Sequence, residues 1–96
     1  MKMIVVVGPH NREQEIRDAL RAHGATSFTE IPEVLRQGQT SATLGTSAFP
    51  GSSRLIFGMV EDDQMTAVVS ALLELKANLF PAERLHACAI PAESLL

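Results

Sequence analysis

The stretch Arg54–Leu75, RLIFGMVEDDQMTAVVSALLEL, lies in the second half of this 96-residue chain. Its first part, residues 54–60, is a continuous apolar run that is typical of a buried strand. Glu61, Asp62 and Asp63 follow, and acids are favoured there because the N-terminus of a helix carries partial positive charge. Apolar residues then recur at helical spacing. The stretch therefore predicts a strand that leads directly into a helix.

The apolar spacing also predicts which side of this helix is buried. Residues three and four apart lie on one face of a helix. We therefore expect a buried stripe of Met65, Val68, Val69, Leu72 and Lys76, with Ala71 and Leu75 beside it. Pro81 ends the region, because a proline ring cannot continue a helix.

The preceding part of the chain predicts another strand and helix. Met3 to Val7 is a β-branched run ended by Gly8-Pro9. Asn11 can cap the helix that follows, with Glu13 and Glu15 in the first turn. Its apolar-leaning stripe is predicted to be Ile16, Ala19, Leu20 and His23, and Gly24 is predicted to end the helix.

Two further strands complete the pattern. Phe28 to Leu35 has mixed strand character, and Pro32 predicts an edge strand or a bulge because proline cannot donate to a ladder. Leu85 to Ile90 alternates in polarity and is stopped by Pro91. Between Phe28–Leu35 and the strand that begins at Arg54, residues 37–53 are rich in glycine, serine and threonine, and they predict a loop far longer than the usual 4–6 residues.

The order strand-helix-strand occurs twice, which gives β-α-β-β-α-β. We expect an α+β, ferredoxin-like fold in which two helices cover one face of a four-stranded antiparallel sheet. Residues 1–96 are predicted to form a single domain whose long, mobile loop at about 37–53 joins the second and third strands.

Composition disfavours several classes of protein. The net charge is −3, the eight basic residues are scattered, and tyrosine and tryptophan are absent, so we expect no nucleic-acid partner. Cys88 is the only cysteine, which favours a cytoplasmic protein. No stretch approaches the ~20 apolar residues of a membrane span. The common catalytic motifs are absent, so we expect a protein that is not an enzyme.

Four stretches, in order, resemble the P-II family of signal-transduction proteins. They are MKMIVVVGPHNREQEIRDAL (1–20), GATSFTEIPEVLRQGQT (24–40), VEDDQMTAVVSALLEL (60–75) and AIPAESL (89–95). Each is weakly specific alone, but their order and spacing cover nearly the whole chain. The resemblance implies a homotrimeric regulatory protein that binds a small effector in clefts between subunits. It also implies that the 37–53 loop signals to a partner protein.

The resemblance further implies which residues contact the effector, which we expect to be an adenine nucleotide such as ATP, ADP or AMP. Thr29 matches the family threonine that faces the base. The expected ligand set is Thr29, Gln37, Gly38, Gln39, Thr40, Arg84 and His86. The same residues also have plainer interpretations, because threonine is common in strands and surface arginines are usually solvated.

The chain departs from the family pattern at FPAERLH, Phe80 to His86. The family has a Gly-x-Gly-Lys phosphate loop there, whereas this stretch has neither glycine nor lysine. The departure indicates a divergent member with a weaker or different ligand. One alternative is a trimeric metal-binding module that uses His86 and Cys88, with His10 as a third ligand. Another is a structural assembly protein that has lost its ligand.

Overall fold

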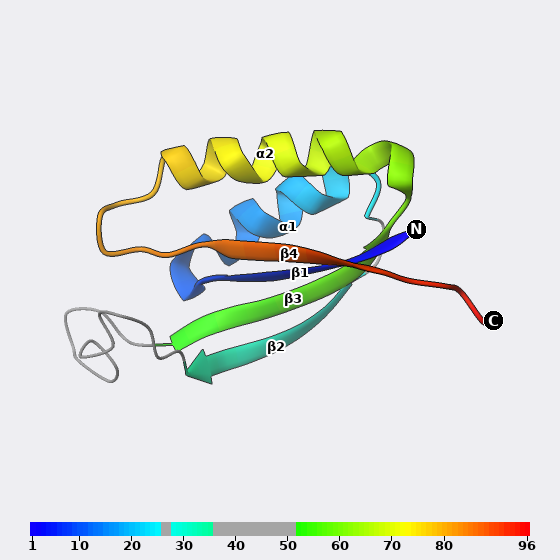
Figure 1. The fold of residues 1–96 in the computed structure, drawn as a ribbon. Coiled ribbons are helices and arrows are strands. Elements are labelled where there is room, and N and C mark those ends of the chain that lie inside the picture. Colours follow the sequence, from blue (N-terminus) through cyan, green and yellow to red (C-terminus); the bar gives the residue numbers. More distant parts are fainter. Residues whose placement is uncertain (26–27, 36–51) are drawn as a thin grey trace.

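The computed structural model describes residues 1–25, 28–35 and 52–96 of the chain. In order, the elements are β1 (Lys2–Pro9), η1 (His10–Arg12), α1 (Glu13–Ala22), β2 (Phe28–Leu35), β3 (Ser52–Val60), η3 (Asp62–Gln64), α2 (Met65–Ala77) and β4 (His86–Pro91). The strands form one antiparallel sheet in the order β2-β3-β1-β4, and both helices lie over the same face (Figure 1). This arrangement confirms the predicted ferredoxin-like α+β fold.

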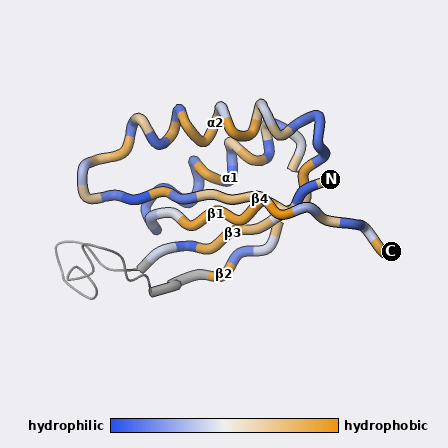
Figure 2. The backbone as a smooth tube through the Cα atoms, viewed as in Figure 1, coloured by the Kyte–Doolittle hydropathy of each residue, from blue (hydrophilic) through white to orange (hydrophobic). Residues whose placement is uncertain are grey.

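The core fills the space between the two helices and the sheet. β1 and β3 occupy the centre of the sheet, and their apolar runs appear as hydrophobic segments beneath the helices (Figure 2). Alternate residues of each strand point toward the helices. The buried apolar residues are Ile4, Val6, Ile16, Leu20, Ala25, Ile56, Val60, Val68, Leu72, Leu75 and Leu85.

The two ends of α1 differ in how well the sequence predicted them. Gly24 has a φ of +106°, which L side chains rarely adopt, and it follows the helix as predicted. The Ala25 amide then donates to the Leu20 carbonyl at 3.1 Å, which satisfies a helix-end acceptor. The predicted Asn11 cap is wrong. α1 begins at Glu13 with Arg12 in the N-cap position and no side-chain cap. Asn11 lies one residue earlier, within η1, and its amide nitrogen donates to the distant Glu83 carboxylate.

β2 is both an edge strand and a bulged strand. It pairs only with β3 among the described strands. The register moves from Ile31 opposite Leu55 to Val34 opposite Ser53, so β2 has one residue more than β3 in this interval. Pro32 lies within the bulge, where the missing amide hydrogen costs no ladder bond.

The predicted phase of α2 is partly wrong. Val68, Leu72 and Leu75 are buried, but Val69 is 44% exposed and Lys76 is also exposed. The buried residues of α2 face α1 and the sheet. Val69 and Lys76 lie on the side of α2 that faces β4, where the opposite residues Ala87 and Ala89 are too small to cover them.

Candidate functional site

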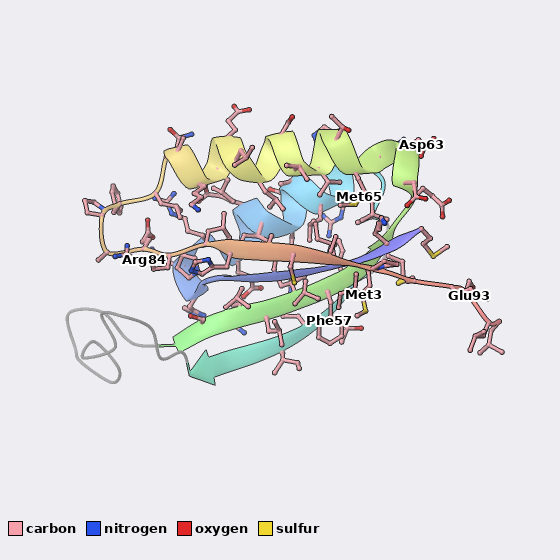
Figure 3. The ribbon with its side chains drawn as sticks, viewed as in Figure 1. Met3, Phe57, Asp63, Met65, Arg84 and Glu93 are labelled. Atoms are coloured by element: carbon pink, nitrogen blue, oxygen red, sulfur yellow. The ribbon has the colours of Figure 1, made fainter. Side chains whose placement is uncertain are left out.

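The face of the sheet opposite the helices is apolar, and no described element covers it. Met3 and Phe57 lie on this side, away from both helices (Figure 3). Residues paired across neighbouring strands point to the same face, and the register therefore places further apolar side chains with them. The open face, as we name it, comprises Met3, Val5, Val7, Ile31, Leu55, Phe57, Met59, Cys88 and Ile90. Ile31, Met59 and Ile90 are each at least 40% exposed.

Thr29 lies on the open face, as an exposed residue of β2. It lines a hollow of about 220 Å3 together with Met3, Phe28, Phe57, Gly58 and Met59. The residues that line this hollow are largely apolar, and Thr29 contributes a hydroxyl group to the lining. Such a mixture suits a nucleotide base, because apolar side chains can pack on the flat aromatic ring and a hydroxyl group can orient its polar edge.

The candidates on β4 lie at the opposite edge of the same face. Cys88 pairs with Val5, which pairs with Phe57, which pairs with Thr29, so one row crosses the whole sheet. His86 lies two residues from Cys88 on β4 and shares its face. Three strand spacings separate Thr29 from this edge, which amounts to roughly 14 Å. One chain therefore does not bring Thr29 and His86 together around a single small ligand.

The connection between α2 and β4 carries Arg84 and contains a tight turn. The Glu83 amide donates to the Phe80 carbonyl at 2.9 Å, and Pro81 occupies the turn position that its fixed φ favours. Arg84 is exposed and donates to the Pro81 carbonyl at 2.6 Å and to the Glu83 carbonyl at 3.1 Å. Figure 3 shows Arg84 at the end of the molecule where this connection enters β4.

Glu83 anchors this turn to the segment between β1 and α1. Its carboxylate accepts hydrogen bonds from Arg12, from Asn11 and from the Phe80 amide. The side chains of Glu83 and Arg12 are only 9% and 16% exposed. Arg12, helped by the Phe80 amide and Asn11, lowers the pKa of Glu83 against the opposing effect of burial. Sequence reasoning did not single out either Glu83 or Arg12.

A second charged cluster holds α1 to the sheet. Arg54, on β3, places its Nε 2.9 Å from Glu13 Oε2 and 2.9 Å from His10 Nδ1. Arg17 donates through Nε to Glu30 on β2 at 3.1 Å, and Glu30 also pairs with Arg54. The hydrogen bonding to Glu30 is the main cause of a raised pKa at Arg17. The cluster therefore fixes the start of β3 against α1.

The remaining candidates are less well supported by the geometry. Within residues 1–25, 28–35 and 52–96, no group of three or more His, Cys, Asp or Glu side chains is placed to hold a metal ion. The Nδ1 of His10 accepts a hydrogen bond from Arg54 at 2.9 Å. Gln37, Gly38, Gln39 and Thr40 lie outside the described residues, as does most of the predicted loop. β3 begins at Ser52, two residues before the predicted start.

An apolar groove of about 310 Å3 runs between α2 and β4. Val69, Leu73 and Lys76 form its helical side, and Ala87 and Ala89 form its strand side.

Among the described residues, no helix is long and apolar enough to cross a membrane.

Comparison of the sequence with models of known protein families gives no match, and comparison with curated proteins gives none either. The structure, in contrast, is similar to several solved structures. One is CPII from Thiomonas intermedia K12 bound to ADP and bicarbonate, at a TM-score of 0.68 and 11% identity over 93% of this chain and 86% of that one.

The same protein bound to ADP, AMP and acetate has a TM-score of 0.65 and 10% identity, over 95% of this chain and 88% of that one. A PII-like signaling protein from Thermus thermophilus has a TM-score of 0.60 and 18% identity, over 93% of this chain and 83% of that one. The chain thus has the fold of the PII-like regulatory proteins. The CPII structure bound to ADP, AMP and bicarbonate, a nitrogen regulatory PII-like protein, matches over 93% of this chain.

Proposed function

We propose that this protein is a divergent PII-like regulatory protein, not an enzyme, and that it works as a homotrimer. It would bind an adenine nucleotide in the clefts between subunits. The observation that carries the proposal is the position of Thr29 and His86 on opposite edges of one uncovered apolar face. The sequence resemblance and the nucleotide-bound structures of similar fold support the choice of ligand.

The open face supports the assembly. It presents three exposed apolar side chains, Ile31, Met59 and Ile90, on the face of the sheet that neither helix covers. A face of this kind in a small domain is stabilised by burial against other copies, because apolar surface is favourably removed from water. Packing the open faces of several copies together brings an edge strand of one copy toward an edge strand of the next.

Such an assembly completes a ligand site that one chain leaves divided. The β2 edge would supply Thr29 and the apolar hollow for the base. The β4 edge of a neighbour would supply Arg84 and His86 for the phosphates, since a guanidinium binds phosphate oxygens in pairs. Gln37, Gly38, Gln39 and Thr40 would complete the contacts from the loop, and residues 37–53 would carry the signal to a partner protein.

A mixing experiment tests whether the site is shared between subunits. Thr29→Val and Arg84→Ala are each expected to weaken binding of ATP, ADP or AMP, measured by calorimetry. Trimers refolded from a mixture of the two variants should regain binding, because each mixed trimer contains one junction with both native residues. Glu74→Ala, which removes an exposed charged side chain from α2, serves as the control.

Two results would overturn the proposal. Failure of the mixed trimers to regain binding would place the site within one subunit. A trimer that binds none of the three nucleotides would leave the structural assembly protein as the better interpretation. Repeating the titrations with zinc added and withheld tests the metal-binding alternative of His86 and Cys88 in the same experiment.

A further inference from the structure

The carboxylate of Glu83 is surrounded by donors as a bound anion would be. Its Oε1 accepts from the Phe80 amide at 2.7 Å and from Arg12 at 3.1 Å, and its Oε2 accepts from Asn11 at 2.9 Å. Arg12 Nε lies 3.2 to 3.3 Å from both oxygens. A backbone amide, a side-chain amide and a forked guanidinium are the donor types that proteins use for carboxylate and phosphate groups.

The donors come from two segments far apart in the sequence. Asn11 and Arg12 belong to η1, whereas Phe80 begins the turn that precedes β4. The Arg12 guanidinium also lies over the Phe80 ring, 5.1 Å from its centroid. The aromatic ring thus supports the guanidinium from one side. Both segments are held in place around one carboxylate.

We propose that the Phe80 amide, Asn11 and Arg12 form an anion-binding cradle, and that Glu83 is its built-in occupant. The tether makes this occupant hard to displace, because an intramolecular ligand competes at an effective concentration of about millimolar or more. Glu83 therefore keeps free anions out of the cradle and sets the shape of the α2–β4 connection without any external ligand. This inference does not depend on the proposed nucleotide site.

Removing the built-in carboxylate should open the cradle to small anions. Glu83→Ala leaves Phe80, Asn11 and Arg12 unchanged, so sodium acetate should raise the melting temperature of this variant more than sodium chloride of equal ionic strength does. Inorganic phosphate should act in the same direction. In nitrogen-15 NMR spectra, the Phe80 amide resonance of the variant should move as acetate is added.

Glu15→Ala is the matched control. Glu15 also pairs with Arg12, at 3.0 Å, but its side chain is 50% exposed and takes its hydrogen bonds from the guanidinium. The wild-type protein and Glu15→Ala should both show no acetate-specific shift. An equal response of all three proteins to acetate and chloride would overturn the proposal.

A second variant keeps the test decisive if Glu83→Ala does not fold. Glu83→Gln retains the size of the side chain and one acceptor oxygen, but it removes the charge. At neutral pH its melting temperature should fall further below that of the wild type than the melting temperature of Glu15→Gln does. An equal or smaller fall would show that Glu83 does not act as an anionic ligand.

Discussion

At the scale of single residues, two adjacent leucines on α2 differ sharply in how far their side chains are exposed to solvent. Leu72 is 6% exposed and packs in the core, whereas Leu73 is 61% exposed beside the groove. The two leucines have the same helix propensity and the same side chain. Any difference between them in a stability measurement therefore reports packing alone.

The first prediction uses this pair. Leu72→Ala should lower the free energy of unfolding by about 2–5 kcal/mol, because it removes buried methyl groups and leaves a cavity. Leu73→Ala should change it by less than about 0.5 kcal/mol, the usual range for surface positions. Chemical denaturation of both variants measures the difference. Equal effects would mean that α2 is rotated about its axis from the position described.

The second prediction concerns the pH dependence of stability at Glu83. Its pKa is lowered in the folded protein, chiefly by Arg12, which also pairs with Glu15. A lowered pKa means that the stabilisation is complete above the unfolded value of about 4.3 and is lost as the pH falls through the folded value.

The wild type should therefore exceed Glu83→Gln in stability by a constant amount near neutral pH. The difference should shrink once the pH drops below about 4.3, and it should keep shrinking toward the folded pKa. Denaturation midpoints of both proteins across this pH range provide the measurement. A difference that grows as the pH falls would contradict the assigned direction of the shift.

At the scale of elements, the sequence predicted the order and type of every α-helix and strand of the described residues, because apolar periodicity is a local signal. Gly24 and Pro32 acted as predicted because the backbone preferences of glycine and proline are also local. The errors arose where tertiary partners decide. Asn11 has the residue type of a cap, but it lies within η1, where its amide nitrogen donates to Glu83, 72 positions away. Val69 is as apolar as Val68, and only the small alanines of β4 leave it exposed.

The same limit explains what was predicted of the site. Arg84 and His86 stood out because the family resemblance pointed to their stretch. Glu83, in the same stretch, was missed because Arg12 and Asn11 are remote in the sequence. One local signal was present, because Glu83 follows Phe80 by three residues, the spacing of a capping box. The Phe80 amide donates to the Glu83 carboxylate, and the Glu83 amide donates to the Phe80 carbonyl.

The third prediction tests how the end of α1 is fixed. Gly24→Ala should destabilise the protein by about 1–2 kcal/mol, because a side chain at positive φ crowds the backbone. The added Cβ would also lie 3.0 Å from Gln64 Cγ. Ala22→Gly, two positions earlier at an exposed site, is the control for a change within the helix, and it should cost at most about 1 kcal/mol. A neutral Gly24→Ala would mean that this turn relaxes without strain.

At the scale of the whole molecule, the two faces of the sheet have different roles. One face packs against α1 and α2 and forms the core. The other carries the apolar open face, with Thr29 near one edge and His86 near the other. A small domain gains buried area by packing such a face against copies of itself. The proposed trimer and the proposed nucleotide site therefore depend on the same surface, and a single substitution there should affect both.

The fourth prediction follows from that dependence. Met59→Asp places a charge on the open face at a position that is 40% exposed in one chain, so the single subunit should still fold. In the trimer the same charge would be buried, which is strongly unfavourable. Light scattering should therefore give the mass of a smaller species for Met59→Asp, and its affinity for adenine nucleotides should fall with it. Leu73→Asp, beside the groove on the helix-covered face and 61% exposed, should keep both the trimer mass and the affinity. A Met59→Asp protein that stays trimeric would show that the open face is not the interface. A dissociated variant that still binds nucleotide with native affinity would show that the ligand site does not lie at the junction between subunits.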